Sequence, residues 1–231
     1  MNFGSLIFVR YNSQRVPGKA LMDIEGHPSI YWLCRQLQYS HHPYVVCMST
    51  NPLDDAIVDF CERNKILFFR GSEGNVLERM HGAIRQFSLT HAVRITGDDL
   101  FVDPDYLEKA IKQYDGSSFC YTDLPKGTDF QIVSSEYIDA LLMRNKKEDT
   151  EYLTWYFNST QDKQFLRLSP VGLSTYGFEL DTEEDAIRVK FIINNLKHHQ
   201  YFVLEDLIEL ARQHEGMFEM KDVVDNRSEE I

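Results

Sequence analysis

Three cationic side chains follow an apolar run near the start of the chain. The stretch SLIFVRYNSQRVPGKAL, from Ser5 to Leu21, carries Arg10, Arg15 and Lys19. Guanidinium groups clamp phosphate oxygens through paired N–H donors, and a lysine ammonium acts as a point charge. The stretch contains neither GxxxxGK[ST] nor G-x-G-x-x-G, the common nucleotide-binding loops. It therefore indicates either an anion-binding loop of another kind or a solvated basic loop.

A second candidate site is RITGDDLFVDPD, from Arg94 to Asp105. Gly97 permits a sharp turn after a strand, so that Asp98 and Asp99 project towards one edge. Magnesium binds hard oxygen ligands, usually one or two carboxylates together with substrate phosphates. One aspartate of this turn is therefore a candidate magnesium ligand. Asp103, which precedes a proline, is predicted to cap the next helix instead.

A third segment, GFELDTEEDAIRV, has the pattern of a helix start. Asp181 or Thr182 is predicted to cap the helix, with Glu184 or Asp185 reaching back to the cap. From these residues alone, helix capping is the favoured interpretation of Asp181.

The first half of the chain alternates short apolar runs with helical patterns, which predicts a parallel sheet with helices on both faces and right-handed crossovers. Ligands bind beyond the carboxyl ends of such strands, so the loop after the first strand and the loop after Thr96 are expected to meet. The predicted strands are Leu6–Arg10, Tyr44–Met48, Ile66–Phe69 and Ala92–Thr96; the predicted helices are Pro28–Tyr39, Leu53–Asn64, Asn75–Phe87 and Asp103–Tyr114.

The pattern is less regular in the second half. An excursion over residues 122–168 is expected to form a lid or a subunit contact. We predict one main domain over residues 1–221 and a polar tail over 222–231. Strands are predicted at Ser118–Thr122, Asp129–Val133 and Phe165–Leu168, and helices at Glu136–Arg144, Glu151–Phe157, Thr182–Leu196 and Glu205–Gln213.

Composition limits the classes of function. The formal net charge of -12 over 231 residues argues against broad binding of nucleic acid or of anionic membranes. No stretch approaches the roughly 20 apolar residues of a membrane span. The four cysteines lie in apolar stretches without CxxC spacing, which predicts buried free thiols and a reducing cytosol. We therefore expect a cytoplasmic protein.

Paired histidines invite a metal-binding interpretation. Neighbouring side chains diverge in both helices and strands, however, and rarely chelate one ion together. We interpret these as surface residues: His41, His42, His198 and His199.

The string R-Y-N-S-Q-R-V-P-G-K-A-L resembles the R-x-x-S-x-R-[LV]-P-G-K-x-L signature of bacterial cytidylyltransferases that activate sugars for surface polysaccharides. The resemblance is to the spore-coat polysaccharide type, which is related to 3-deoxy-manno-octulosonate and acylneuraminate cytidylyltransferases. It spans roughly residues 5 to 215, because further segments follow in the family's order: DDAIVDFCE, FRGSEGNVLERMHGAI, VRITGDDLFVDP, DFQIVSSEYIDAL and LDTEEDAIRV.

The resemblance implies a fold and a set of site residues. The fold is an α/β, three-layer nucleotide-diphospho-sugar transferase fold (Rossmann-like), with a mixed and mainly parallel sheet. The catalytic residues are Arg15, Lys19, Asp98 and Asp181, the last two as Mg2+ ligands. The triphosphate and the rest of the nucleotide are expected to contact Arg10, Ser13, Arg15, Lys19, Arg70, Gly71, Ser72, Arg79, Arg94, Thr96 and Gly97. The acceptor is expected to contact Asp99, Asp129, Glu151 and Tyr156.

Two family motifs are altered in this chain. The usual G-D-C-P-L is Gly97-Asp98-Asp99-Leu100-Phe101 here, and E-H-V-T-P-Y is Glu151-Tyr152-Leu153-Thr154-Trp155-Tyr156. The second motif helps to form the acceptor pocket or a dimer contact in relatives. The proposed phosphate and metal residues are all present.

The resemblance implies a magnesium-dependent cytidylyltransferase. Such an enzyme transfers CMP from CTP to a sugar or sugar-acid acceptor with release of pyrophosphate, and is expected to be a homodimer. Two alternatives stay open. One is a glycosyltransferase of related fold, although Asp98-Asp99 lacks D-x-D spacing. The other is a non-catalytic nucleotide-binding homologue.

Overall fold

The computed structural model describes residues 1–13, 15–144, 153–170, 176–197 and 199–219. A seven-stranded sheet crosses the molecule in the order β5-β4-β1-β6-β8-β7-β9. Its strands are β1 (Phe3–Phe8), β4 (Tyr44–Ser49), β5 (Phe68–Gly71), β6 (His91–Thr96), β7 (Phe119–Thr122), β8 (Gln131–Ser134) and β9 (Lys163–Leu166). Only β8 runs antiparallel to its neighbours among these strands, so the sheet is mixed and mainly parallel.

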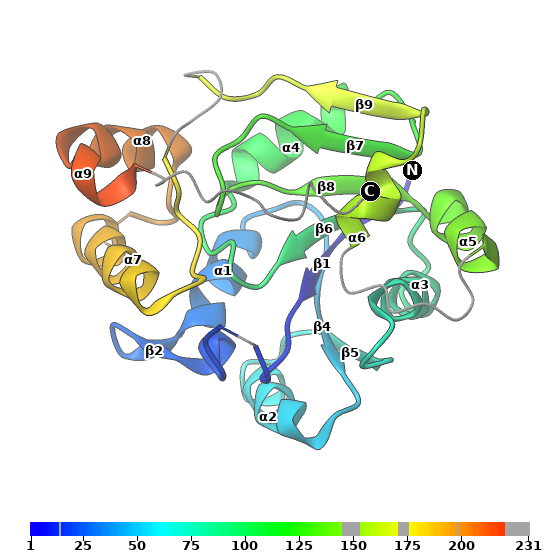
Figure 1. Cartoon of the computed structure of the whole chain (residues 1–231), viewed down its shortest axis with the longest axis horizontal. Coiled ribbons are helices and arrows are strands. Elements are labelled where there is room, and N and C mark those ends of the chain that lie inside the picture. Colours follow the sequence, from blue (N-terminus) through cyan, green and yellow to red (C-terminus); the bar gives the residue numbers. More distant parts are fainter. Residues whose placement is uncertain (14, 145–152, 171–175, 198, 220–231) are drawn as a thin grey trace.

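Helices cover both faces of the sheet. In Figure 1 the sheet rises from β5 to β9, with α3 and α5 on the right and α7, α8 and α9 on the left. No helix in the described ranges is long and apolar enough to cross a membrane. The helices are α1 (Ser29–Leu37), α2 (Asp55–Arg63), α3 (Val76–Gln86), α4 (Pro104–Gln113), α5 (Ser135–Arg144), α6 (Leu153–Asn158), α7 (Glu183–Leu196), α8 (Leu204–Gln213) and α9 (Glu215–Phe218).

Alternating side chains of the central strand β1 pack into two hydrophobic clusters, one on each face of the sheet. In β1, Ile7 joins the cluster formed with α1, α2, α4, α7 and α8, whereas Leu6 and Phe8 join the cluster formed with α3, α5 and α6. All six residues of β1 are buried. A strand buried on both faces is typical of a parallel sheet that lies between two helical layers, as the sequence predicts.

Most predicted elements are present, and their bounds differ in places. The first strand begins at Phe3 rather than Leu6, because Phe3–Ser5 pairs with His91–Val93. The third strand is Phe68–Gly71 rather than Ile66–Phe69. The predicted helix Leu53–Asn64 is divided into a 3-10 turn, Pro52–Asp54, and α2.

The excursion over residues 122–168 contributes two strands to the main sheet. Strand β8 inserts between β6 and β7, and β9 pairs with β7 in parallel. The described part of the excursion is therefore integrated with the sheet and does not form a separate lid. The predicted helix Glu151–Phe157 corresponds to α6, which begins at Leu153, and Glu151 lies outside the described residues.

The loops after β1 and β6 meet, as the parallel topology predicts. The amide of Gly97 donates a hydrogen bond to the carbonyl of Phe8 at 3.0 Å. A Cβ atom at Gly97 would lie 2.2 Å from Val9 Cγ1. Glycine therefore allows the two strand ends to approach this closely.

The segment before α7 is fixed to the same edge of the sheet by a turn at Gly127. The Phe178 amide donates to the Lys126 carbonyl at 2.9 Å, and the Leu180 amide donates to the Asp98 carbonyl at 3.0 Å. Gly127 has a φ of 87°, and a Cβ atom there would lie 2.3 Å from the Glu179 backbone nitrogen. This contact places residue 181 beside the loop after β6.

We expect Gly127→Ala to destabilise the protein far more than Gly26→Ala. Gly26 has a similar φ of 81°, and a Cβ atom there would have no other atom within 4 Å. The control, Gly26→Ala, should therefore lower the free energy of unfolding only by the cost of placing alanine in a left-handed conformation, about 1–2 kcal/mol. Gly127→Ala should cost an additional ~1–3 kcal/mol, because its Cβ overlaps backbone atoms that have no other position. Urea unfolding measures both free energies, and equal losses would contradict the importance of this contact.

Candidate active site

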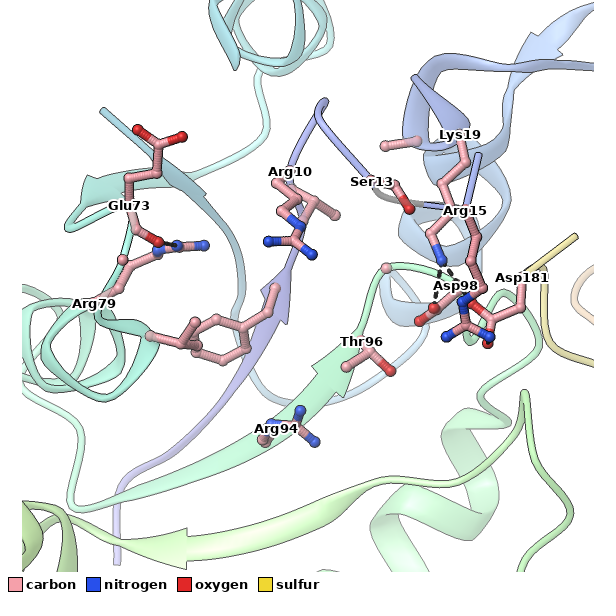
Figure 2. A pocket seen from close by; sticks show the side chains of 16 residues that line it. Arg10, Ser13, Arg15, Lys19, Glu73, Arg79, Arg94, Thr96, Asp98 and Asp181 are labelled. Atoms are coloured by element: carbon pink, nitrogen blue, oxygen red, sulfur yellow. Dashed lines mark hydrogen bonds and ion pairs between the residues drawn. The ribbon is translucent and has the colours of Figure 1, made fainter. Parts of the chain in front are cut away.

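A cavity of about 460 Å³ lies at the carboxyl ends of β1, β5 and β6. Cationic and acidic side chains line it together with a small apolar floor. Figure 2 shows Lys19, Arg15, Asp98 and Asp181 at one end and Arg79 with Glu73 at the other. The lining residues are Phe8, Val9, Arg10, Ser13, Arg15, Lys19, Ala20, Glu73, Gly74, Val76, Arg79, Arg94, Thr96, Gly97, Asp98 and Asp181.

The loop after β1 is held by a buried carboxylate. Asp54 is 1% exposed, and its Oδ1 accepts a hydrogen bond from the Tyr11 amide at 2.7 Å. Its Oδ2 accepts from the Ser49 amide at 2.8 Å and from the Ser49 hydroxyl at 2.5 Å. Its position before α2 suggests an interaction with the helix dipole, but its side chain makes no capping hydrogen bond. Asp54 instead ties the loop to the end of β4.

Lys19 lies between two carboxylates. Its Nζ is 2.6 Å from Asp98 Oδ2 and 2.8 Å from Asp181 Oδ1. Gly18, with a φ of 74°, begins the short 3-10 helix Lys19–Leu21, and its amide donates to the Tyr11 carbonyl at 2.7 Å. The left-handed turn therefore directs the lysine back towards the ends of the strands.

The contacts of Lys19 with the carboxylates shift the pKa values of Lys19 and Asp98. Burial disfavours the charged ammonium, but Asp98 and Asp181 outweigh it and raise the pKa of Lys19. Burial likewise acts to raise the pKa of Asp98, but the charge and hydrogen bond of Lys19 hold that pKa below its ordinary value. The Lys19 ammonium and the Asp98 carboxylate are therefore both ionised at neutral pH.

Asp181 is available to the site because its neighbours cap the helix. The Thr182 side chain accepts from the Asp185 amide at 3.1 Å, and Asp185 Oδ2 accepts from the Thr182 amide at 2.8 Å. This reciprocal capping box confirms the helix start predicted from the sequence. The Asp181 carboxylate points into the cavity and also pairs with Arg15, at 2.9 Å.

Asp98 and Asp181 fit a divalent cation that also contacts substrate. Their oxygens already converge on one positive charge, the ammonium of Lys19. The described residues contain no cluster of three or more His, Cys, Asp or Glu side chains arranged for a metal. Magnesium commonly uses only one or two carboxylates and completes its shell with phosphates and water. The donor set therefore suits a metal that is shared with a phosphorylated ligand.

A partly buried polar cluster includes Arg94 and Thr96, which line the cavity. Arg94 Nη1 donates to Gln131 Oε1 at 3.1 Å, and Arg94 Nε has no hydrogen-bond partner among the described residues. Asp99 accepts from the Thr96 hydroxyl and, at 3.3 Å, from its amide. Burial, followed by the charge of Asp129, raises the pKa of Asp99 well above its usual range, and burial raises the pKa of Asp129 to about 6.

Arg79 of α3 lines the cavity, whereas Arg70 of β5 does not. Arg79 is 4% exposed and donates from Nε to the Ser72 carbonyl at 2.9 Å and from Nη2 to the Glu73 carbonyl at 3.1 Å. It therefore holds the loop that borders the cavity. Arg70 points elsewhere: it donates to the carbonyls of Ser49 and Asn51 and pairs with Asp55 at 2.7 Å.

The structure brings most of the predicted nucleotide residues together. The cavity is lined by Arg10, Ser13, Arg15, Lys19, Arg79, Arg94, Thr96, Gly97, Asp98 and Asp181. It is not lined by Arg70, Gly71, Ser72, Asp99, Asp129 or Tyr156. The sequence did not single out Glu73, Gly74 and Val76, although they follow directly after Ser72 in a segment that resembles the family. All functional roles of these residues stay predictions.

Comparison with known proteins identifies a family for this chain. A family model described as "Cytidylyltransferase" matches residues 5–222. A relative is the "Spore coat polysaccharide biosynthesis protein SpsF" of Bacillus subtilis (strain 168), 26% identical over 223 residues, which are 90% of this chain and 93% of the relative.

Solved structures share the fold. A cytidylyltransferase from Leptospira borgpetersenii has a TM-score of 0.86 at 21% identity, over 96% of this chain and 99% of the other. A CMP:2-keto-3-deoxy-manno-octonic acid synthetase complexed with CTP has a TM-score of 0.61 at 14% identity, over 84% and 99%. These matches confirm the predicted α/β nucleotidyltransferase-like fold with its mixed, mainly parallel sheet.

We expect Asp129 to make the stability of the protein fall as pH rises from about 4 to about 6. The folded-state pKa of about 6 lies above the ordinary value of 3.8. Over this range the unfolded chain has already released its proton, so the folded state becomes relatively less stable. Asp129→Asn should make this loss smaller, although Asp99, whose pKa burial also raises, still contributes to it; urea unfolding at several pH values would detect the difference. Parallel pH profiles for the two proteins would contradict the assignment.

Proposed function

The chain belongs to the cytidylyltransferase family, and we propose that it transfers CMP from CTP to a sugar or sugar-acid acceptor with release of pyrophosphate. The product would be a precursor for a surface polysaccharide or glycoconjugate. The observation that carries this proposal is the cavity in which Arg10, Arg15 and Lys19 face Asp98 and Asp181. Cations for a triphosphate and carboxylates for its metal are what the reaction requires.

The named relatives support the choice of substrates. The spore-coat protein is named for polysaccharide biosynthesis, and the solved synthetase is complexed with CTP and named for a keto-sugar acid. We propose a nucleotide of the same kind for this chain, and an acceptor of the sugar or sugar-acid class.

The residues would act mainly by alignment and charge. The acceptor hydroxyl attacks the α-phosphorus, a new oxygen–phosphorus bond forms, the bond to pyrophosphate breaks, and the hydroxyl proton passes to solvent. Arg10, Arg15 and Lys19 would hold the triphosphate in line and offset the charge of the departing pyrophosphate. Asp98 and Asp181 would hold Mg2+, which when bound neutralises charge on the phosphate oxygens.

The proposal also covers the domain organisation, the location and the oligomeric state of the enzyme. We propose one nucleotidyltransferase domain over residues 1–221, with an acceptor-binding or dimerisation role for 122–168. The buried thiols support a cytoplasmic location, since a reducing compartment keeps cysteines unpaired. The homodimer rests on the resemblance to the family alone.

Calorimetric titration with CTP, UTP, GTP and ATP, each with and without Mg2+, tests the nucleotide half of the proposal. We expect selective binding of CTP that Mg2+ strengthens, followed by pyrophosphate release when the acceptor is present. Binding of no triphosphate would refute the proposal and favour a glycosyltransferase. CTP binding without pyrophosphate release across a panel of sugars and sugar acids would favour a non-catalytic homologue.

We expect Asp181→Asn to lower metal-dependent turnover by about a hundredfold with little change in stability. The helix cap is supplied by Thr182 and Asp185, so the free energy of unfolding should hardly change. Thr182→Ala is the matched control: it should cost about 1 kcal/mol of stability and keep most of the turnover. Pyrophosphate release and urea unfolding measure the two effects. The reverse pattern would show that Asp181 serves the helix rather than the reaction.

A further inference from the structure

The Lys19 ammonium occupies the place that suits the divalent cation. It is within hydrogen-bond distance of one oxygen from each carboxylate, 2.6 Å for Asp98 and 2.8 Å for Asp181. Magnesium binds carboxylate oxygens at about 2.1 Å. A metal that uses both oxygens would therefore lie against the same ammonium, and like charges at that separation repel strongly.

Lys19 is firmly held in this position. Its side chain is only 16% exposed, and the two carboxylates are 21% and 23% exposed. Its backbone is also fixed, since the Lys19 carbonyl accepts a hydrogen bond from the Ser29 hydroxyl at 2.5 Å. The ammonium has to move by rotation of its side chain, and it then needs another negative partner, because an unpaired charge in a partly buried place is costly.

A triphosphate is the partner that the cavity provides for. Arg10 and Arg15 line the same cavity, so anionic oxygens bound there would lie among cations. Arg15 also pairs with Asp181, at its other oxygen, but its side chain is 63% exposed and can turn into solvent. Lys19 is thus the cation whose release from the carboxylates depends on the arrival of a phosphorylated ligand.

We propose that Lys19 is an internal counter-ion that keeps divalent metal out of the Asp98–Asp181 site until a triphosphate draws the ammonium away. Metal alone has to displace Lys19 without giving it a partner, and therefore binds weakly. Metal and triphosphate together exchange one arrangement of paired charges for another, and therefore bind cooperatively. The proposal rests on the proposed function for the identity of the triphosphate as CTP.

Binding of Mn2+ in the absence of nucleotide tests the proposal directly. Mn2+ prefers the same oxygen ligands, and its free form is measured by electron paramagnetic resonance. Lys19→Met keeps the aliphatic part of the side chain and removes the charge. We expect it to bind Mn2+ about tenfold or more tightly than the wild type, in the range typical of coupling between sites. Lys19→Arg keeps the charge and should stay weak.

Two controls test whether the tighter Mn2+ binding occurs at the Asp98–Asp181 site. The double variant Lys19→Met with Asp181→Asn should lose the tight Mn2+ binding, because one ligand is missing. In the wild type, inorganic tripolyphosphate should tighten Mn2+ binding at the protein by a similar factor, after correction for Mn2+ bound by free tripolyphosphate. The latter measurement needs no variant, so the proposal stays testable if Lys19→Met does not fold.

The outcomes separate this inference from the proposed function. Folded Lys19→Met that binds Mn2+ no more tightly than the wild type would overturn the inference, and so would tight Mn2+ binding by the wild type without tripolyphosphate. Neither measurement uses CTP or turnover. If the Mn2+ results are as expected and CTP fails to bind, the inference about Lys19 stands and the choice of nucleotide fails.

Discussion

Two carboxylates that share one partly buried place need a cation between them, and this requirement organises the site. Asp98, Asp181 and Lys19 come from three distant parts of the chain. Each is brought in by backbone features: the close approach of strands at Gly97, the hydrogen bond from the Leu180 amide to the Asp98 carbonyl, and the left-handed turn at Gly18. The charges therefore stabilise an arrangement that the backbone has already assembled.

The antiparallel strand β8 separates two parts of the sheet that contribute differently to the site. The strands β5, β4, β1 and β6 on one side of it run parallel to one another, and the carboxyl ends of β1, β5 and β6 supply most of the cavity. Beyond β6 the chain contributes β8, β7 and β9 and the turn at Gly127, which supports the segment carrying Asp181. Among the described residues, the second half of the protein thus reaches the cavity through Asp181.

The sequence predicted the sheet and most of the residues that gather at the candidate site, because both depend on local signals. Parallel strands appear as apolar runs, and the loop after each strand end is known once the order of elements is known. The sequence did not predict where Arg70 points, since that depends on carbonyls of a neighbouring loop, at Ser49 and Asn51, that compete for its guanidinium. Nor did it predict that Lys19 bridges both aspartates, because that contact depends on the turn at Gly127, which no local pattern marks.

The four free cysteines offer a way to observe whether the two sides of the sheet unfold together. Cys34, Cys47 and Cys61 lie in α1, β4 and α2, whereas Cys120 lies in β7, and all four are buried. Burial raises the pKa of the Cys120 thiol to about 12, so a thiol reagent reacts only after the surrounding structure opens. Each cysteine therefore reports the opening of the structure around it, and unequal labelling of Cys120 and the other three would show that the two sides of the sheet open separately.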